Sequence, residues 1–135
     1  MSHQLEFSIK KSFLANHSGI TIPFTMMRND LVVEGYAKID TGSEYCLFQY
    51  DLAEAMGINV ESGTRIDLST LGGRIYAYAH AVTLDTFGIT FESTVLFSPS
   101  TINRNILGRI GWLNNLQLAL SMNDETIYLN SADGE

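Results

Sequence analysis

Asp40 stands directly before Thr41, Gly42 and Ser43, at the end of the apolar run 31–39. A carboxylate held at the end of a strand can take a proton from water and so act as a general base. A structural interpretation competes with this one, because Asp in such a turn often accepts hydrogen bonds from its own backbone. The tripeptide Asp-Thr-Gly alone leaves catalysis and a simple turn open, so the rest of the chain must be considered.

Other patterns of catalytic chemistry are missing from the sequence. The three histidines, His3, His17 and His80, lack the spacing of metal ligands, so no metal site is expected. Cys46 is the single cysteine, which excludes an internal disulfide and favours a small buried hydrophobic residue over a nucleophile. No Gly-x-Ser-x-Gly elbow and no phosphate-binding loop are present. The Asp-Thr-Gly segment is the remaining candidate for catalysis.

Composition limits the classes of protein to which the chain can belong. Its 135 residues are 45% hydrophobic and 17% charged, the proportions of a single globular domain. The net charge of −7 comes from scattered acids without a cluster of Lys or Arg, so nucleic acid is not expected as a partner. No window approaches the roughly 18 apolar residues of a membrane span, and the N-terminus lacks the apolar core of a signal peptide. We expect a cytoplasmic protein with no membrane partner.

Most segments between turn signals are rich in β-branched and aromatic residues, which predicts an all-β domain. The expected strands and hairpins cover residues 19–26, 31–40, 64–85, 89–97 and 117–129. A short helix is predicted at 50–57, and the segment 105–116 is expected to pass from a strand into a second short helix that bears Trp112. Asp40 is therefore expected at a strand end, followed within about ten residues by a helix.

Three motifs occur in a fixed order along the chain: "AKIDTGSEY", "STLGGRIYAY" and "VLFSPSTINRNILGRIGWL". This order and spacing resemble the retropepsin-like (retroviral-type) aspartic proteases over roughly residues 19–130. The resemblance implies a single all-β domain at 19–130, closed and β-barrel-like, with a flap hairpin and one or two short helices. Residues 1–18 would be an N-terminal extension, and residues 131–135 a flexible tail.

The resemblance also assigns roles within the first motif. Asp40 would be the catalytic carboxylate, and the Thr41 hydroxyl would lock two active-site loops together. Gly42 would let the substrate backbone approach, and Ser43 occupies the Ala/Ser position of the family. By the same resemblance, this route needs no metal and no organic cofactor.

The second and third motifs supply the remaining expected site residues. Leu71, Gly72 and Gly73 would form the tip of the flap, with Ile75 on its inner face. Arg109 would pair with an acid just beyond the catalytic loop, which in this chain is Glu44. We therefore predict a Glu44–Arg109 salt bridge that supports the site.

Hydrolysis by this route needs two carboxylates that share a proton, whereas the chain has one Asp-Thr-Gly. The resemblance therefore implies an aspartic endopeptidase that acts on peptides or proteins as a homodimer with one Asp40 from each chain. A non-catalytic retropepsin-like module for dimerisation or peptide binding is the alternative. It is favoured by Ile110, where retroviral members have Asp or Asn, and by the additional 117–129 hairpin. A regulatory protein in which Asp-Thr-Gly is coincidental is a further alternative.

Overall fold

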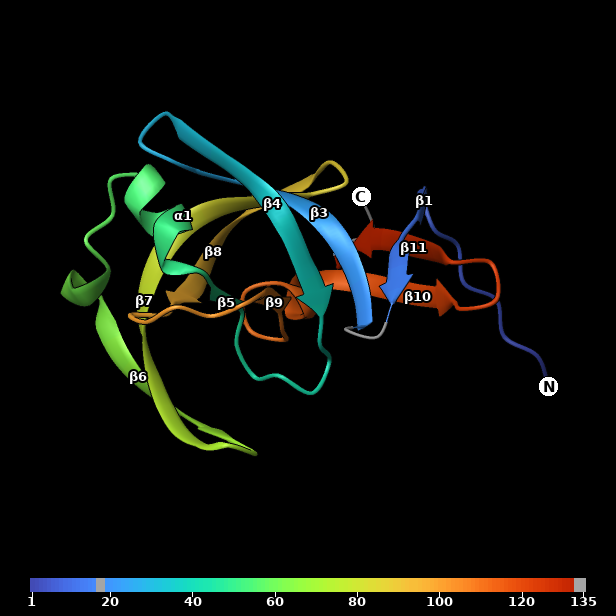
Figure 1. The fold of residues 1–135 in the computed structure, drawn as a ribbon. Helices are drawn as coiled ribbons and strands as arrows, with labels where there is room; N and C mark the ends of the chain where they lie inside the picture. Colours follow the sequence, from blue (N-terminus) through green and yellow to red (C-terminus); the bar gives the residue numbers. More distant parts are fainter. Residues whose placement is uncertain (17–18, 133–135) are drawn as a thin grey trace.

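The structure of the protein is a computed structural model that describes residues 1–16 and 19–132 (Figure 1). Strands dominate it, in agreement with the predicted all-β class. The strands are β1 (Ile9–Ser12), β2 (Leu14–Asn16), β3 (Gly19–Arg28), β4 (Leu31–Ile39), β5 (Leu47–Phe48), β6 (Thr64–Thr70), β7 (Gly73–Thr86), β8 (Ile89–Phe97), β9 (Asn105–Leu107), β10 (Leu116–Ser121) and β11 (Thr126–Ser131). Between them lie the helix α1 (Tyr50–Ala55) and two 3-10 turns, η1 (Val60–Ser62) and η2 (Leu113–Asn115).

Eight strands form one sheet in the order β2-β3-β4-β9-β5-β8-β7-β6. An additional antiparallel pairing of β3 with β7, at Thr25–Met27 and Thr83–Asp85, joins two strands that stand far apart in this order. The sheet therefore closes on itself, which confirms the expected barrel-like shape. Pro23 lies between the end of the β2 pairing at Thr21 and the start of the β7 pairing at Thr25, where its missing N–H disrupts no ladder.

The core of the barrel is built from alternating inward residues and a stack of aromatic rings. In β4, for example, Ala37 and Ile39 are buried, whereas Tyr36, on the opposite face of the strand, is exposed. Phe48 packs edge-on against Phe24, with ring centroids 5.1 Å apart, and also contacts Phe97 at 6.2 Å. These contacts fix the strands on either side of the Asp40 segment.

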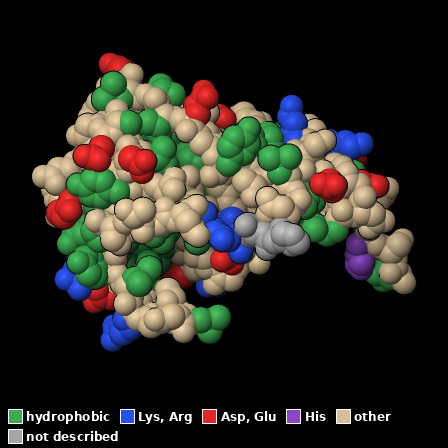
Figure 2. Space-filling view, in the orientation of Figure 1, with side chains coloured by type: hydrophobic (Ala, Val, Ile, Leu, Met, Phe, Trp, Pro, Cys, Tyr) green, Lys and Arg blue, Asp and Glu red, His purple; other side chains and the backbone are tan. Residues whose placement is uncertain are grey.

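Strands β6 and β7 form the long hairpin expected around "TLGG". Their pairing runs from Thr64 with Ala79 to Thr70 with Gly73, which leaves Leu71 and Gly72 as a two-residue tip. We call residues 64–79 the flap hairpin. It projects from the barrel and its tip lies opposite the loop that follows β4 (Figure 1). Figure 2 shows it extending from the lower part of the molecule, and shows the acidic side chains scattered over this face without a continuous patch.

A separate three-stranded antiparallel sheet, in the order β1-β11-β10, lies beside the barrel, away from the flap hairpin (Figure 1). Ile9 pairs with Leu129 and Ser12 with Thr126, so part of the predicted N-terminal extension is strand. The hairpin predicted at 117–129 is present as β10 and β11, and β11 continues to Ser131. Of the predicted tail, residues 133–135 lie outside the described residues.

The helices are shorter than the sequence predicts. The predicted helix at 50–57 is α1, which ends at Ala55, and Gly57 follows it with a φ of 72°. The second helix is wrong: Trp112 precedes a single 3-10 turn, and its indole N–H bonds the Thr86 hydroxyl at 3.0 Å. Trp112 is fully buried, so packing of its side chain in the core, and not a helix, holds this segment in place. No helix in the described residues is long and apolar enough to cross a membrane.

Candidate active site

The site begins where β4 ends. Ile39 pairs in parallel with Leu107 of β9, and the Asp40 N–H donates to the Leu107 carbonyl at 3.0 Å. The chain then turns, because the Ser43 N–H donates to the Asp40 carbonyl at 3.1 Å. The two neighbouring parallel strands therefore fix the starting point of the loop of residues 40–46, which we call the Asp40 loop.

The carboxylate of Asp40 is half-buried and accepts a hydrogen bond from the Gly42 N–H at 3.1 Å through Oδ1. This is the local turn bond that the structural interpretation of the motif expects. It uses one oxygen, and among the described residues no other group bonds the carboxylate, so Oδ2 is left for water or substrate. The turn and a catalytic role are compatible in this geometry.

The segment 107–111 holds the Asp40 loop by its backbone. The Arg109 N–H donates to the Ser43 carbonyl at 3.0 Å, and the Ile110 N–H donates to the Glu44 carbonyl at 2.8 Å. At Gly108 a Cβ atom would lie 2.2 Å from the Tyr45 carbonyl oxygen, a distance that no real side chain shows. The glycine of the "ILGR" motif is therefore needed here, because it lets the backbone of segment 107–111 lie in close contact with the backbone of the Asp40 loop.

Cys46 closes the loop on its buried side. The Gly108 N–H donates to its Sγ at 3.3 Å, and the side chain is fully buried. Burial raises the pKa of the Cys46 thiol to about 11, although the bond from the Gly108 backbone partly opposes this. A thiol with so high a pKa is a poor nucleophile, as the sequence predicts.

The other residues of the motif are placed along the loop. The Ser43 hydroxyl donates to the Tyr45 carbonyl at 2.8 Å and so stabilises the loop itself. Thr41 and Gly42 are exposed. The locking role of Thr41 involves a second loop that this chain does not contain, so it stays a prediction.

The Glu44–Arg109 salt bridge is absent: within the described residues the ion pair is Arg65 with Asp67. The Arg109 side chain instead donates from Nε to the Ser43 carbonyl at 3.4 Å. Both Glu44 and Arg109 are exposed, so water solvates their charges and little is gained by pairing them. Arg109 therefore supports the Asp40 loop through its backbone bond and its guanidinium, without Glu44.

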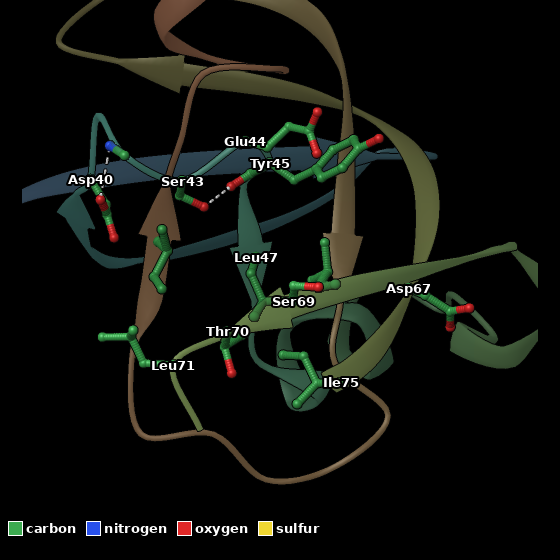
Figure 3. A pocket seen from close by; sticks show the side chains of 13 residues that line it. Asp40, Ser43, Glu44, Tyr45, Leu47, Asp67, Ser69, Thr70, Leu71 and Ile75 are labelled. Atoms are coloured by element: carbon green, nitrogen blue, oxygen red, sulfur yellow. Dashed lines mark hydrogen bonds between the residues drawn. The ribbon is translucent and has the colours of Figure 1, made fainter. Parts of the chain in front are cut away.

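A pocket of about 680 Å³ lies between the Asp40 loop and the flap hairpin (Figure 3). From the expected site residues it brings together Asp40, Gly42, Ser43, Glu44, Leu71 and Ile75. Gly72, in the flap tip, and Gly73, which is the first residue of β7 and not part of the two-residue tip, lie outside this lining. Gly73 has a φ of 118°, which favours glycine there.

Sequence reasoning missed the other lining residues, which are Tyr45, Leu47, Asp67, Leu68, Ser69, Thr70 and Ile106. They come from the Asp40 loop itself, from the first arm of the flap hairpin, from β5 and from β9. A signal for some of them was present, since the residues that follow Asp40 and those that precede the flap tip both belong to recognised motifs. The contribution of β9 depends on its parallel pairing with β4, which no local pattern reveals.

Within the described residues, no metal-binding cluster accompanies this pocket. Across residues 1–16 and 19–132 no group of three or more His, Cys, Asp or Glu could hold a metal ion. His80, the one buried histidine of those residues, bonds the Val60 carbonyl at 2.8 Å at the base of the flap hairpin.

The comparisons with known proteins agree with this geometry. A family model described as aspartyl protease matches residues 25–112, more than half of the chain. The matched span includes Asp40, the flap hairpin and Gly108, that is, the three parts that surround the pocket. No curated protein matches the chain significantly.

Proposed function

The chain belongs to the aspartyl protease family, and from this premise we propose that it is an endopeptidase in which two copies each contribute Asp40 to one active site. The observation that carries the proposal is the position of Asp40, whose carboxylate lies at the wall of a 680 Å³ pocket covered by a flap hairpin. The Asp40 loop is held by backbone bonds to segment 107–111, so the carboxylate has a fixed position from which to act.

A second chain is proposed because one chain supplies one Asp-Thr-Gly carboxylate, that of Asp40. Glu44 and Asp67 also line the pocket, but in Figure 3 they lie on the side away from Asp40. A two-fold axis beside the Asp40 loop would bring Asp40 of the partner subunit next to the first. The Thr41 side chain is exposed in the single chain, and the same axis would bring the two copies of it together where the two Asp40 loops meet.

The chemistry then follows from two adjacent carboxylates. Their mutual repulsion favours a state in which they share one proton. The ionised carboxylate takes a proton from a water molecule, the oxygen of which attacks the peptide carbonyl, while the protonated carboxyl donates a hydrogen bond to the carbonyl oxygen. The tetrahedral intermediate breaks when the leaving nitrogen receives a proton, and the dyad returns to its starting state.

The flap hairpin would hold the substrate in this reaction. A peptide in the pocket lies between the Asp40 loop and β6, in the extended form in which main-chain groups can pair with a neighbouring strand. Closure of the tip with Leu71 over the peptide would exclude bulk water from the dyad.

The first test compares the wild type with Asp40→Asn and with the control Asp51→Asn, an exposed acid on α1 outside the pocket. We expect the wild type to cleave an unstructured protein and Asp40→Asn to fall by at least about 10³-fold, because one substitution removes both carboxylates. Asp51→Asn should keep the wild-type rate. An Asp40→Asn protein with wild-type activity would refute the mechanism.

A mixing experiment tests whether the dyad is shared. When equal amounts of wild type and Asp40→Asn exchange subunits at constant total protein, about a quarter of the wild-type activity should remain, because only wild-type pairs have both carboxylates. About half would remain if each chain acted alone. Equilibrium sedimentation of both samples should give the mass of two chains, and an inert dimer of the wild type would favour the non-catalytic alternative.

A further inference from the structure

The pocket has an end away from Asp40 that the catalytic reaction does not use. Glu44 and Asp67 both line the pocket on that side, but their side chains lie apart from each other (Figure 3). None of the described residues that line the pocket is Lys, Arg or His. A ligand that enters this end therefore meets the Glu44 carboxylate, whereas Asp67 already has Arg65 as an ion-pair partner.

Glu44 carries an unpaired charge. The expected partner, Arg109, bonds the Ser43 carbonyl instead, and no described residue forms an ion pair or a hydrogen bond with the Glu44 carboxylate. Asp67 accepts a bond from Arg65 Nε at 3.2 Å, but both side chains are more than half exposed. Such a surface pair contributes little and is readily exchanged for another cation.

The wall between the two ends of the pocket is apolar. Leu47, Leu68, Ile75 and Ile106 line it, and the first two belong to or pack against a small buried cluster with Ala77 and Leu96. Lysine and arginine have long aliphatic stems with a charge at the end, so they suit a pocket with an apolar wall and an acidic end. An acidic side chain would be repelled, and a neutral one would leave the carboxylate without a partner.

The charge of the whole molecule acts in the same direction. With 15 Asp and Glu against 8 Lys and Arg, the protein attracts cationic peptides at long range and repels anionic ones. This attraction is general, whereas the position of Glu44 selects a particular residue of the bound peptide.

We propose that the protein selects peptides with a lysine or arginine side chain that reaches Glu44, at a position removed from the bond that is cut. The proposal rests on the protease function proposed above. Glu44 acts here as the specificity-determining residue.

The test uses a set of peptides that differ at one position, with Lys, Arg, Gln or Glu, and scans that position along the peptide. For the wild type, kcat/KM at one position should be roughly two- to fivefold higher with Lys or Arg than with Gln, and lowest with Glu, because an exposed ion pair contributes at most about 1 kcal/mol. Glu44→Gln should reduce the Lys-to-Gln ratio to near one, and 0.5 M salt should reduce it in the wild type. The control Glu54→Gln, an exposed acid on α1 outside this pocket, should leave the ratio unchanged. The ratio is informative even if Glu44→Gln lowers the rate on every peptide.

Cleavage without preference for basic peptides, or a preference that persists in Glu44→Gln, would overturn the proposal while leaving the protease function intact. If the wild type cleaves no peptide, the proposed protease function is refuted, and the preference for basic peptides is then tested by measuring binding. In that case fluorescence anisotropy with Asp40→Asn should show tighter binding of the Lys peptide than of the Gln peptide, and the double variant Asp40→Asn/Glu44→Gln should lose the difference. Equal binding of the two peptides to Asp40→Asn would overturn the proposal.

Discussion

The Asp40 loop and the flap hairpin line the same pocket, but they are held in opposite ways. The loop is fixed by backbone bonds to segment 107–111 and by the buried Cys46. From Leu71 to Tyr76 every residue of the flap hairpin is exposed, and a Cβ at Gly73 would meet nothing within 4 Å. The difference suits a site in which one wall must keep a reacting group in place and the other must admit a substrate.

The freedom of the flap hairpin is limited to its outer part. At its base the His80 ring bonds the Val60 carbonyl at 2.8 Å, and a Cβ at Gly63 would lie 2.4 Å from the Ala79 carbonyl oxygen. These contacts tie the base to the barrel, so opening need not disturb the core. Local opening requires little free energy where few buried contacts are lost.

The largest effect on the rigid wall of the pocket is expected from adding a side chain at Gly108. Gly108→Ala should destabilise the protein by about 2–4 kcal/mol and abolish cleavage, because the new Cβ would push segment 107–111 away from the Asp40 loop. Gly72→Ala, at the flap tip, should change the free energy of unfolding by less than about 1 kcal/mol, because the nearest atom to the new Cβ would be Thr70 Oγ1 at 3.8 Å. Urea unfolding measures both. Equal effects of the two substitutions would show that the two walls do not differ in rigidity.

Raising the pH tests how well the fold protects the Cys46 thiol, which lies on the buried side of the Asp40 loop. The thiol pKa of Cys46 rises from 9.0 to about 11 on burial, so the folded state keeps its proton where the unfolded chain has lost it. The stability gained from the protonated native thiol is fully present below pH 9 and is lost as the pH rises toward 11, by roughly 2–3 kcal/mol.

Urea unfolding between pH 8 and pH 11 measures this effect as the difference between the wild type and Cys46→Ala. The variant should lose less stability over that range, because every other residue is the same in the two proteins and its contribution cancels in the difference. Parallel curves for the two proteins would mean that the thiol is not protected by the fold.

The smallest expected change in stability is at the flap tip. Leu71→Ala should leave the free energy of unfolding within about 0.5 kcal/mol of the wild type, because the side chain is fully exposed. Its kcat/KM should nevertheless fall roughly 3–10-fold if the side chain covers bound peptide. Leu14→Ala, an exposed leucine on β2 outside the pocket, is the matched control and should alter neither quantity.

Sequence patterns predicted the features that depend on short segments. The strands with alternating residues, the flap tip at Leu71 and Gly72, and the Asp40 turn after β4 are all local, and all are present. The close contact of Gly108 with the Asp40 loop could be anticipated only through the family resemblance, because 65 residues separate Ser43 from Gly108.

What could not be predicted depends on long-range pairing and on competition with solvent. The β3–β7 contact that closes the barrel joins antiparallel strands without a connecting turn, so no local signal marks it. The Glu44–Arg109 pair was expected from the family resemblance, but two exposed ions gain too little to displace water. The helix expected around Trp112 is not formed, because burial of the indole and its hydrogen bond to Thr86 determine the path of the chain there.

The pairing of β1 with β11 has a consequence for biosynthesis. Ile9 and Leu129 are neighbours in the small sheet although 120 residues separate them, and the Phe13 N–H donates to the Glu125 carbonyl at 3.0 Å. Because β1 has no other partner in that sheet, its ladder forms only after β11 has left the ribosome. Contacts of such high sequence separation form slowly. The newly made chain therefore completes the small sheet only after the segments that carry Asp40 and the flap hairpin have been synthesised.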